Sequence, residues 1–150
     1  MRRIFLVLCT AAALTGCSVL DRGASCTEAD MDSGVAVVWR PADFGDQDAA
    51  TIRLCVDGTC KEMASGSPGD PIAQVSVRLP KDVGATTVPV RLRVTSKKDG
   101  RIVVEDSRRA RLTEQHPNGA SCAPTAWTAA FRADPEKGLT SPKGMSLQGK

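Results

Sequence analysis

Apolar and polar residues alternate with a period of two along much of the chain. In the run 72–79, Val75, Val77 and Leu79 alternate with polar neighbours, and the run 88–94 repeats the pattern. Successive side chains of a β-strand point to opposite faces of its sheet. These runs therefore predict strands with one buried and one solvated face.

Three further runs predict strands nearer the ends of the domain. The Val-rich run 34–39 and the run 107–113 are each expected to form a strand. The run 125–133 alternates like a strand, but Trp127 and Phe131 also have the four-residue spacing of a helix face. We expect a strand here, with a helix as the alternative.

The segment 51–63 predicts a β-hairpin, because Asp57-Gly58 at its centre is a favoured two-residue turn. In this register Cys55 faces Cys60 at a non-hydrogen-bonded position, where Cα atoms approach to about 4.5 Å. That separation suits a disulfide bond. One face of the hairpin is expected to be charged and the other apolar, through the pairs Arg53 with Glu62 and Ile52 with Met63.

A second hairpin is predicted around Lys98-Asp99-Gly100, a three-residue loop with glycine in the left-handed position. This register places Val94 opposite Val104 and Arg93 opposite Glu105. The apolar pair would then face the core and the charged pair would face solvent. Ala110 and Leu112, further along the second strand, are also expected to point inward.

About seven short strands over roughly 110 residues predict an all-β fold. The expected architecture is a small immunoglobulin-like or fibronectin-III-like β-sandwich stapled by disulfides. Residues 26–134 would form this domain. Residues 135–150, rich in Pro, Gly, Lys and Ser, are expected to be a disordered tail.

The N-terminus carries the clearest motif in the chain. Arg2 and Arg3 precede the apolar stretch 4–14, which is too short to span a bilayer and has the length of a signal-peptide core. The sequence Leu14-Thr15-Gly16-Cys17 follows and resembles the lipobox of bacterial lipoproteins. The resemblance implies diacylglycerol transfer to Cys17, removal of residues 1–16 and often acylation of the new amine. An ordinary secretory signal with a chance cysteine is the alternative.

The resemblance places the mature chain on the extracytoplasmic side of the cell membrane, with residues 17–25 as a lipidated tether. Arg outnumbers Lys by 13 to 7 and Val outnumbers Ile by 14 to 4, which indicates a GC-rich genome and favours a Gram-positive over a Gram-negative host. Without Arg2 and Arg3, 18 basic and 17 acidic residues remain. This balance gives no support to nucleic-acid binding.

Cysteine usage fits an oxidising compartment. Setting aside Cys9 in the signal and Cys17 at the lipid site leaves an even number in the mature domain: Cys26, Cys55, Cys60 and Cys122. The hairpin geometry favours Cys55–Cys60, and therefore Cys26–Cys122, among the three possible pairings. Spacings of 29, 5 and 62 residues do not form the paired knuckles of a zinc site, and no C-x-x-C redox motif is present.

Two clusters of charged residues are candidate binding sites. Asp43, Asp46 and Asp48 place three carboxylates within six residues, a weak candidate for Ca²⁺ that is more simply a solvated acidic loop. If the strand assignments hold, five arginines point outward and form a face for an anionic partner: Arg78, Arg91, Arg93, Arg109 and Arg111. A charged, soluble sheet surface is the alternative interpretation of this face.

The sequence contains few residues or motifs that are typical of a catalytic site. The one histidine, His116, lies in a Pro-Asn-Gly turn, and the chain contains no H-E-x-x-H, P-loop, G-x-G-x-x-G or G-x-S-x-G motif. We therefore expect a non-catalytic binding or scaffolding lipoprotein without a cofactor, whose partner is an envelope protein or an anionic envelope component. The alternatives are a small-ligand or metal carrier, or a small cell-envelope hydrolase that uses scattered carboxylates.

Overall fold

The computed structural model describes residues 26 and 29–143. In this part of the chain, strands alternate with short turns, as the period-two patterns predict. A single four-residue 3-10 helix, η1 (Pro41–Phe44), interrupts the described strands. The strands are β1 (Gly34–Trp39), β2 (Ala50–Val56), β3 (Thr59–Ala64), β4 (Ala73–Arg78), β5 (Thr87–Ser96), β6 (Ile102–Arg111), β7 (Thr113–Gln115), β8 (Ala126–Asp134) and β9 (Gly138–Thr140).

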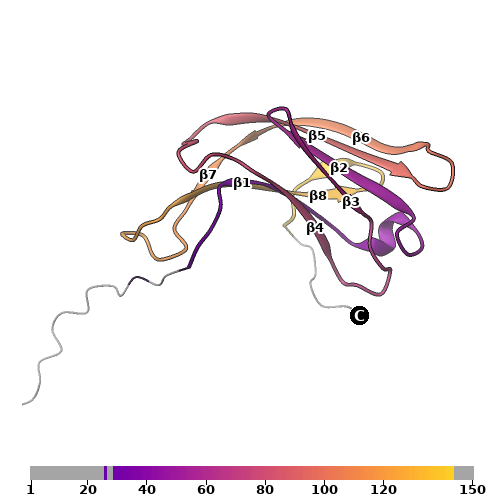
Figure 1. Ribbon diagram of the computed structural model, residues 1–150, viewed down its shortest axis with the longest axis horizontal. Coiled ribbons are helices and arrows are strands. Elements are labelled where there is room, and N and C mark those ends of the chain that lie inside the picture. Colours follow the sequence, from indigo (N-terminus) through magenta and orange to yellow (C-terminus); the bar gives the residue numbers. More distant parts are fainter. Residues whose placement is uncertain (1–25, 27–28, 144–150) are drawn as a thin grey trace, which may run out of the picture.

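These strands form two sheets that pack face to face (Figure 1). The first sheet has the order β4-β1-β8-β7, with β9 also paired to β8, and the second sheet has the order β3-β2-β5-β6. β1 and β8 run parallel, so the first and last long strands of the domain are neighbours. The predicted all-β, disulfide-stapled sandwich is confirmed, and β7 and β9 raise the strand number above the expected seven.

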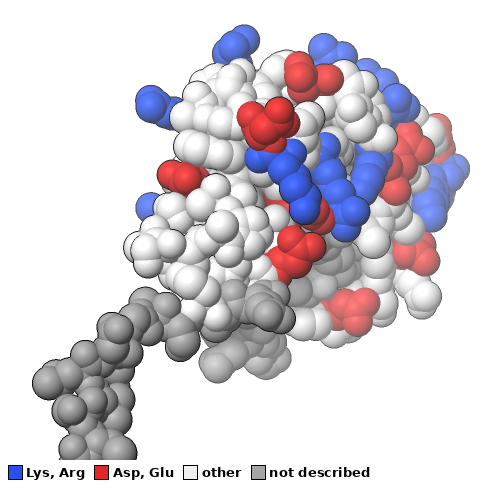
Figure 2. Space-filling view, turned by 60° about the vertical axis from the view of Figure 1, so that its left-hand side comes forward, with Lys and Arg blue, Asp and Glu red and all other residues white. Residues whose placement is uncertain are grey.

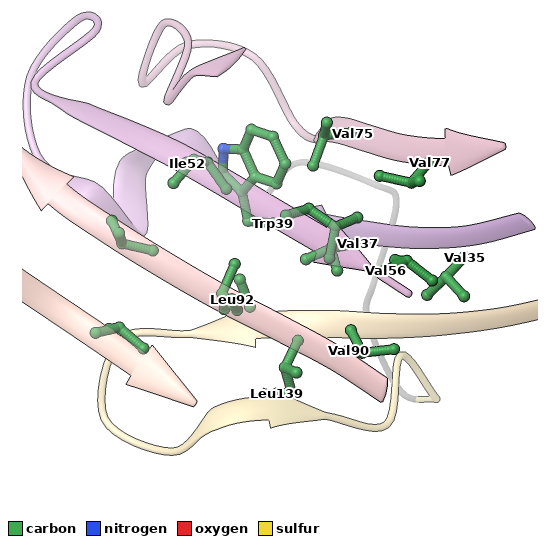
Figure 3. Packing of buried hydrophobic residues seen from close by; sticks show 14 of the residues in the cluster. Val35, Val37, Trp39, Ile52, Val56, Val75, Val77, Val90, Leu92 and Leu139 are labelled. Atoms are coloured by element: carbon green, nitrogen blue, oxygen red, sulfur yellow. The ribbon is translucent and has the colours of Figure 1, made fainter. Parts of the chain in front are cut away.

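The core lies between the two sheets. Alternate residues of β1 and β4 point toward alternate residues of β2 and β5, and Leu139 of β9 joins them, as the labelled side chains in Figure 3 show. Trp39 is fully buried, and its indole N–H donates to the carbonyl oxygen of Ser65 at 2.7 Å. The Ser65 hydroxyl in turn accepts from the backbone N–H of Ala50 at 3.1 Å. The large ring is thus packed without leaving its polar atom unsatisfied.

The first predicted hairpin has the expected register, and the second has it as far as Val94. Beyond Val94 the register shifts by one, so that Thr95 pairs with Ile102 and the loop has four residues, 97–100, where three were expected. Cys55 pairs with Cys60 and Arg53 with Glu62, while Val94 pairs with Val104. The expected apolar face of the first hairpin is wrong at one position, since Met63 is 47% exposed although its partner Ile52 is fully buried. β3 is the edge strand of the second sheet, so its core-side residues are not covered as those of β2 are.

The segment with two possible structures, 125–133, forms strand β8 at Ala126–Asp134. Its inward residues Trp127, Ala129 and Phe131 pack against the core. The strand pairs with β1 on one side and with β7 and β9 on the other. A helix would satisfy its own backbone groups but would leave the facing edges of these three strands without hydrogen-bond partners.

The prediction of a disordered tail from residue 135 is wrong for the described residues up to 143. Gly138–Thr140 forms β9 against β8, and Leu139 is buried. The Leu139 N–H donates to Oδ2 of Asp106 on β6 at 2.9 Å, which ties the end of the domain to the other sheet. Polar composition favoured disorder, but one buried leucine and one carboxylate acceptor fix this segment in place.

Both predicted disulfides are present. Cys55–Cys60 has a Cα separation of 4.0 Å, and Cys26–Cys122 has one of 5.6 Å. Beside the longer bridge, the Asn118 side chain accepts from Ala29 N–H at 2.7 Å and donates to the carbonyl oxygens of Ala29 and Ala123 at 3.1 Å. The disulfide and this amide together fasten the segment before β1 to the loop before β8.

The predicted signal peptide at 1–16, the lipid site at Cys17 and the tether at 17–25 lie outside the described residues, as do residues 144–150. None of the described segments forms a helix that could span a bilayer.

Candidate functional site: an arginine-lined hollow

The outer face of the second sheet carries a hollow of about 660 Å³. Five arginines line it, and the Cys55–Cys60 disulfide lies among them. They are Arg53 on β2, Arg91 and Arg93 on β5, and Arg108 and Arg109 on β6. We call this site the arginine hollow. Four of these arginines, Arg53, Arg91, Arg93 and Arg109, point outward, because neighbours along their strands such as Leu54 and Leu92 fill the core on the opposite face.

Two of the four outward arginines are neutralised within the sheet. The register aligns Glu62, Arg53, Arg93 and Glu105 in one row across β3, β2, β5 and β6. Arg53 Nη1 lies 3.1 Å from Glu62 Oε1, and Arg93 Nη2 lies 2.6 Å from Glu105 Oε1. The flanking carboxylates offset the repulsion between two arginines that face each other directly.

The other two arginines have no such partner. Arg91 lies in the next row, between Cys55 and Ser107, and Arg109 is opposite Pro89 one row further. Among the described residues, no carboxylate oxygen lies within 4.0 Å of a guanidinium nitrogen of Arg91 or Arg109. Of the four outward arginines, two are therefore neutralised within the sheet and two can bind an anion from outside.

Asp57 is the acidic residue that lines the hollow. It occupies the β2–β3 turn with a φ of 47°, and its backbone N–H donates to the carbonyl oxygen of Pro89 at 3.1 Å. This bond holds the turn beside β5, where Asp57 lines the hollow. Its negative charge opposes the entry of an anion.

The structure brings together three of the five arginines predicted for one face. Arg91, Arg93 and Arg109 line the hollow, and Arg111 lies beyond it on β6, opposite Thr87. Arg78 is misplaced in the prediction, because β4 belongs to the first sheet, and its Nε lies 2.7 Å from Asp32 Oδ2.

Arg53 also belongs to the hollow, which the sequence reasoning missed. The hairpin register alone predicts that the Arg53 side chain points outward. Its position beside Arg93 depends on β2 pairing with β5, a non-local contact that alternation does not reveal. Over the face shown in Figure 2, Lys and Arg side chains are interspersed with Asp and Glu, and several basic side chains adjoin one another.

Arg108, between Ser107 and Arg109, is engaged elsewhere. Its Nε lies 3.1 Å from Asp106 Oδ2. Partial burial of Asp106 acts to raise its pKa, but hydrogen bonds from the N–H groups of Leu139 and Ser107, together with Arg108, outweigh this effect and lower the pKa. Asp106 therefore remains ionised and holds Arg108 toward β9.

The predicted acidic loop does not gather into a metal site in the part of the chain that the structure describes. Arg132 Nη2 contacts Asp43 Oδ2 at 3.2 Å, and Asp48 Oδ1 accepts from the Gly66 N–H at 3.1 Å. Asp46 is exposed at the turn. Two of the three carboxylates are thus occupied by the protein's own donors.

Acid–base groups are not concentrated at the hollow. His116 Nε2 lies 3.7 Å from Glu114 Oε2, beside β7 of the first sheet. Hydrogen bonds from Ser96 and from the Arg101 N–H lower the pKa of Asp99, and N–H donors of Glu136 and Lys137 lower that of Asp134. A carboxyl that serves as a general acid near neutral pH needs a raised pKa, which neither of these residues has.

Comparison with known proteins gives no relative from which a function could be transferred. No protein-family model, no curated protein and no solved structure matches the chain.

Proposed function

We propose that the chain is a lipid-anchored, extracytoplasmic lipoprotein whose domain binds an anionic component of the cell envelope without catalysis. The arginine hollow is the binding surface. The observation that carries this proposal is the pair Arg91 and Arg109, which project from adjacent strands of a rigid sheet and have no carboxylate partner among the described residues. Guanidinium groups suit phosphate and carboxylate ligands by charge and by shape.

The position of the hollow relative to the proposed anchor supports a ligand near the membrane. Arg109 lies four residues before Thr113, which pairs with Thr128, and Thr128 pairs with Gly34 at the start of β1. The hollow thus lies toward the end of the sandwich where the chain enters from the predicted tether. Figure 1 shows β7 at this left-hand end, with the tip of the β5–β6 hairpin at the other.

The length of the predicted tether also keeps the domain close to the membrane surface. The predicted tether from residue 17 to residue 25 spans at most about 30 Å when fully extended. The Cys26–Cys122 bridge fixes the start of the domain immediately after it. Lipid headgroups and anionic polymers at the membrane surface therefore lie within the range of the domain.

Site-specific photo-cross-linking in intact cells tests the proposal with the anchored protein. A photoreactive amino acid is placed at Ser107, which faces Arg91 in the hollow, or at Ser76, which is exposed on β4 of the other sheet. We expect an envelope lipid, polymer or protein to be captured at Ser107 and lost when Arg91 and Arg109 are replaced by alanine. Equal capture from both positions, or capture that survives the replacements, would contradict the proposal.

A further inference from the structure

We propose that the group recognised by the arginine hollow is a phosphomonoester, held between Arg91 and Arg109. This inference rests on the proposed function and narrows it to one ligand chemistry. It begins from the charge pattern of the sheet. Glu62, Glu105 and Asp106 neutralise one of the five arginines each, which leaves the guanidinium groups of Arg91 and Arg109 for an external anion.

The spacing of these two arginines suits a single small anion. Arg91 pairs with Ser107, and Arg109 is two residues further along β6, so the two arginines are diagonal neighbours on one face. Diagonal neighbours in an antiparallel sheet are about 7–8 Å apart. Arginine side chains span this separation, and both guanidinium forks can converge on one group between them.

Charge and shape favour a phosphomonoester among small anions. Such a group carries about −1.5 to −2 charges at neutral pH and offers three terminal oxygens, which match two guanidinium forks. A carboxylate or a phosphodiester carries one charge and two terminal oxygens, which a single arginine can satisfy. The Ser107 hydroxyl, directly opposite Arg91, adds a neutral donor on the same face.

The other residues around the hollow limit what else is recognised. None of the residues lining it is aromatic, so the site offers no stacking platform for a nucleobase or a sugar ring. Asp57, the acidic residue among those lining the hollow, weakens the attraction for anions in general and so favours a ligand that engages both arginines. The hollow therefore recognises the phosphate itself rather than the molecule that carries it.

Three probes test the inference on a soluble form beginning at Ser18, which keeps every described residue, both sheets and both disulfides. The first is glycerol phosphate, a soluble phosphomonoester, followed through the arginine Nε–Hε signals by NMR. The others are phosphatidylcholine vesicles containing phosphatidic acid, a monoester headgroup, or phosphatidylglycerol, a diester headgroup. The two vesicle types are adjusted to equal zeta potential, so that surface charge does not distinguish them.

We expect the soluble form to bind vesicles containing phosphatidic acid about tenfold more tightly than vesicles containing phosphatidylglycerol. A tenfold difference in affinity is what one additional charge-assisted hydrogen bond would give. If the natural source is soluble, glycerol phosphate shifts the Arg91 and Arg109 signals without a vesicle preference, which also supports the inference. The variant Arg91→Lys/Arg109→Lys keeps the charge but loses the forks. It should retain phosphatidylglycerol binding and lose the monoester preference.

Equal binding to the two vesicle types, with no response to glycerol phosphate, would overturn the phosphomonoester assignment while the proposed function stands. If the lysine variant still prefers the monoester, the preference does not depend on the two guanidinium groups, and the placement of the phosphate between Arg91 and Arg109 would be overturned. Failure to bind any of the three probes would overturn the inference. In that case, capture by the Ser107 cross-linker decides separately whether the hollow has another envelope partner.

Discussion

Removing the Cys26–Cys122 bridge should destabilise the domain far more than removing Cys55–Cys60. The two cysteine pairs are separated by 96 and 5 residues respectively. In the chain-entropy description, the cost of opening a bridge grows with the logarithm of the loop that it closes. It amounts to about 4.7 kcal/mol for the long loop and about 2 kcal/mol for the short one.

The native structure explains why this loss acts mainly through the unfolded chain. Without the long bridge, the ends of the domain are still held by the parallel pairing of β1 with β8. The Asn118 side chain continues to bond Ala29 and Ala123. The folded sheets should therefore keep their arrangement in the variant Cys26→Ser/Cys122→Ser, while the unfolded ensemble gains freedom.

Thermal and urea unfolding of the two double-serine variants measures the difference. At roughly 4 °C per kcal/mol for a domain of this size, Tm should fall by close to 20 °C without the long bridge and by about 8 °C without the short one. The urea m-value should rise most for the long-bridge variant, since its unfolded state exposes more surface. An equal or larger loss on removing Cys55–Cys60 would refute the loop-entropy reasoning and make the hairpin bridge the main structural one.

Three further predictions concern the anchor and the closing strand. Cys17→Ala should abolish incorporation of labelled fatty acid, and continued acylation would refute the lipoprotein assignment. Because the pKa of Asp106 is lowered from 3.8 in the folded state, its contribution to stability is present above that value and is lost as the pH falls through the folded-state pKa. In acid titrations of the unfolding free energy, Asp106→Asn should therefore give a shallower decline than the unaltered chain, and an unchanged slope would exclude this role. Gly138 has a φ of +73°, and an added Cβ would lie 2.6 Å from Cβ of Asp106. Gly138→Ala should accordingly cost about 1–3 kcal/mol in chemical denaturation, whereas a neutral effect would contradict the β6–β9 contact.

Local features of the fold could be predicted from sequence because they depend on neighbours in the chain. The turn Asp57-Gly58 determines the register of its hairpin, and this register places Cys55 opposite Cys60. Alternation likewise identified the buried faces of β4 and β5. Such signals extend over a few residues, where turn type and side-chain period are sufficient.

The composition of the site could be predicted only in part, because it depends on which strands become neighbours. Arg78 and Arg91 have the same alternating context, yet they lie on different sheets. Arg53 joins Arg93 through the pairing of β2 with β5, and Asp106 binds Leu139 across 33 residues. These contacts are selected by the packing of the whole core, and no short window of sequence contains them.

The claim that Arg91 and Arg109 attract an anionic envelope component is tested most directly by a series of charge variants of the soluble form. Sedimentation with phosphatidylglycerol vesicles is measured at low and high salt for Arg91→Ala/Arg109→Ala and for Asp57→Asn. Asp57→Asn removes the negative charge of Asp57 and introduces a residue that tolerates the same turn conformation. Arg78→Ala/Arg101→Ala, which removes two arginines that pair with Asp32 and Asp99 outside the hollow, is the matched control.

We predict that binding is strongest for Asp57→Asn, equal for the unaltered chain and the control, and weakest for Arg91→Ala/Arg109→Ala. The differences should shrink at high salt, since surface attractions are screened over about 8 Å at physiological ionic strength. If the control loses as much binding as the hollow variant, net charge alone governs binding and the arginine hollow is not the site. If Asp57→Asn binds no better than the unaltered chain, the anion does not bind near Asp57, which also contradicts the arginine hollow as the site.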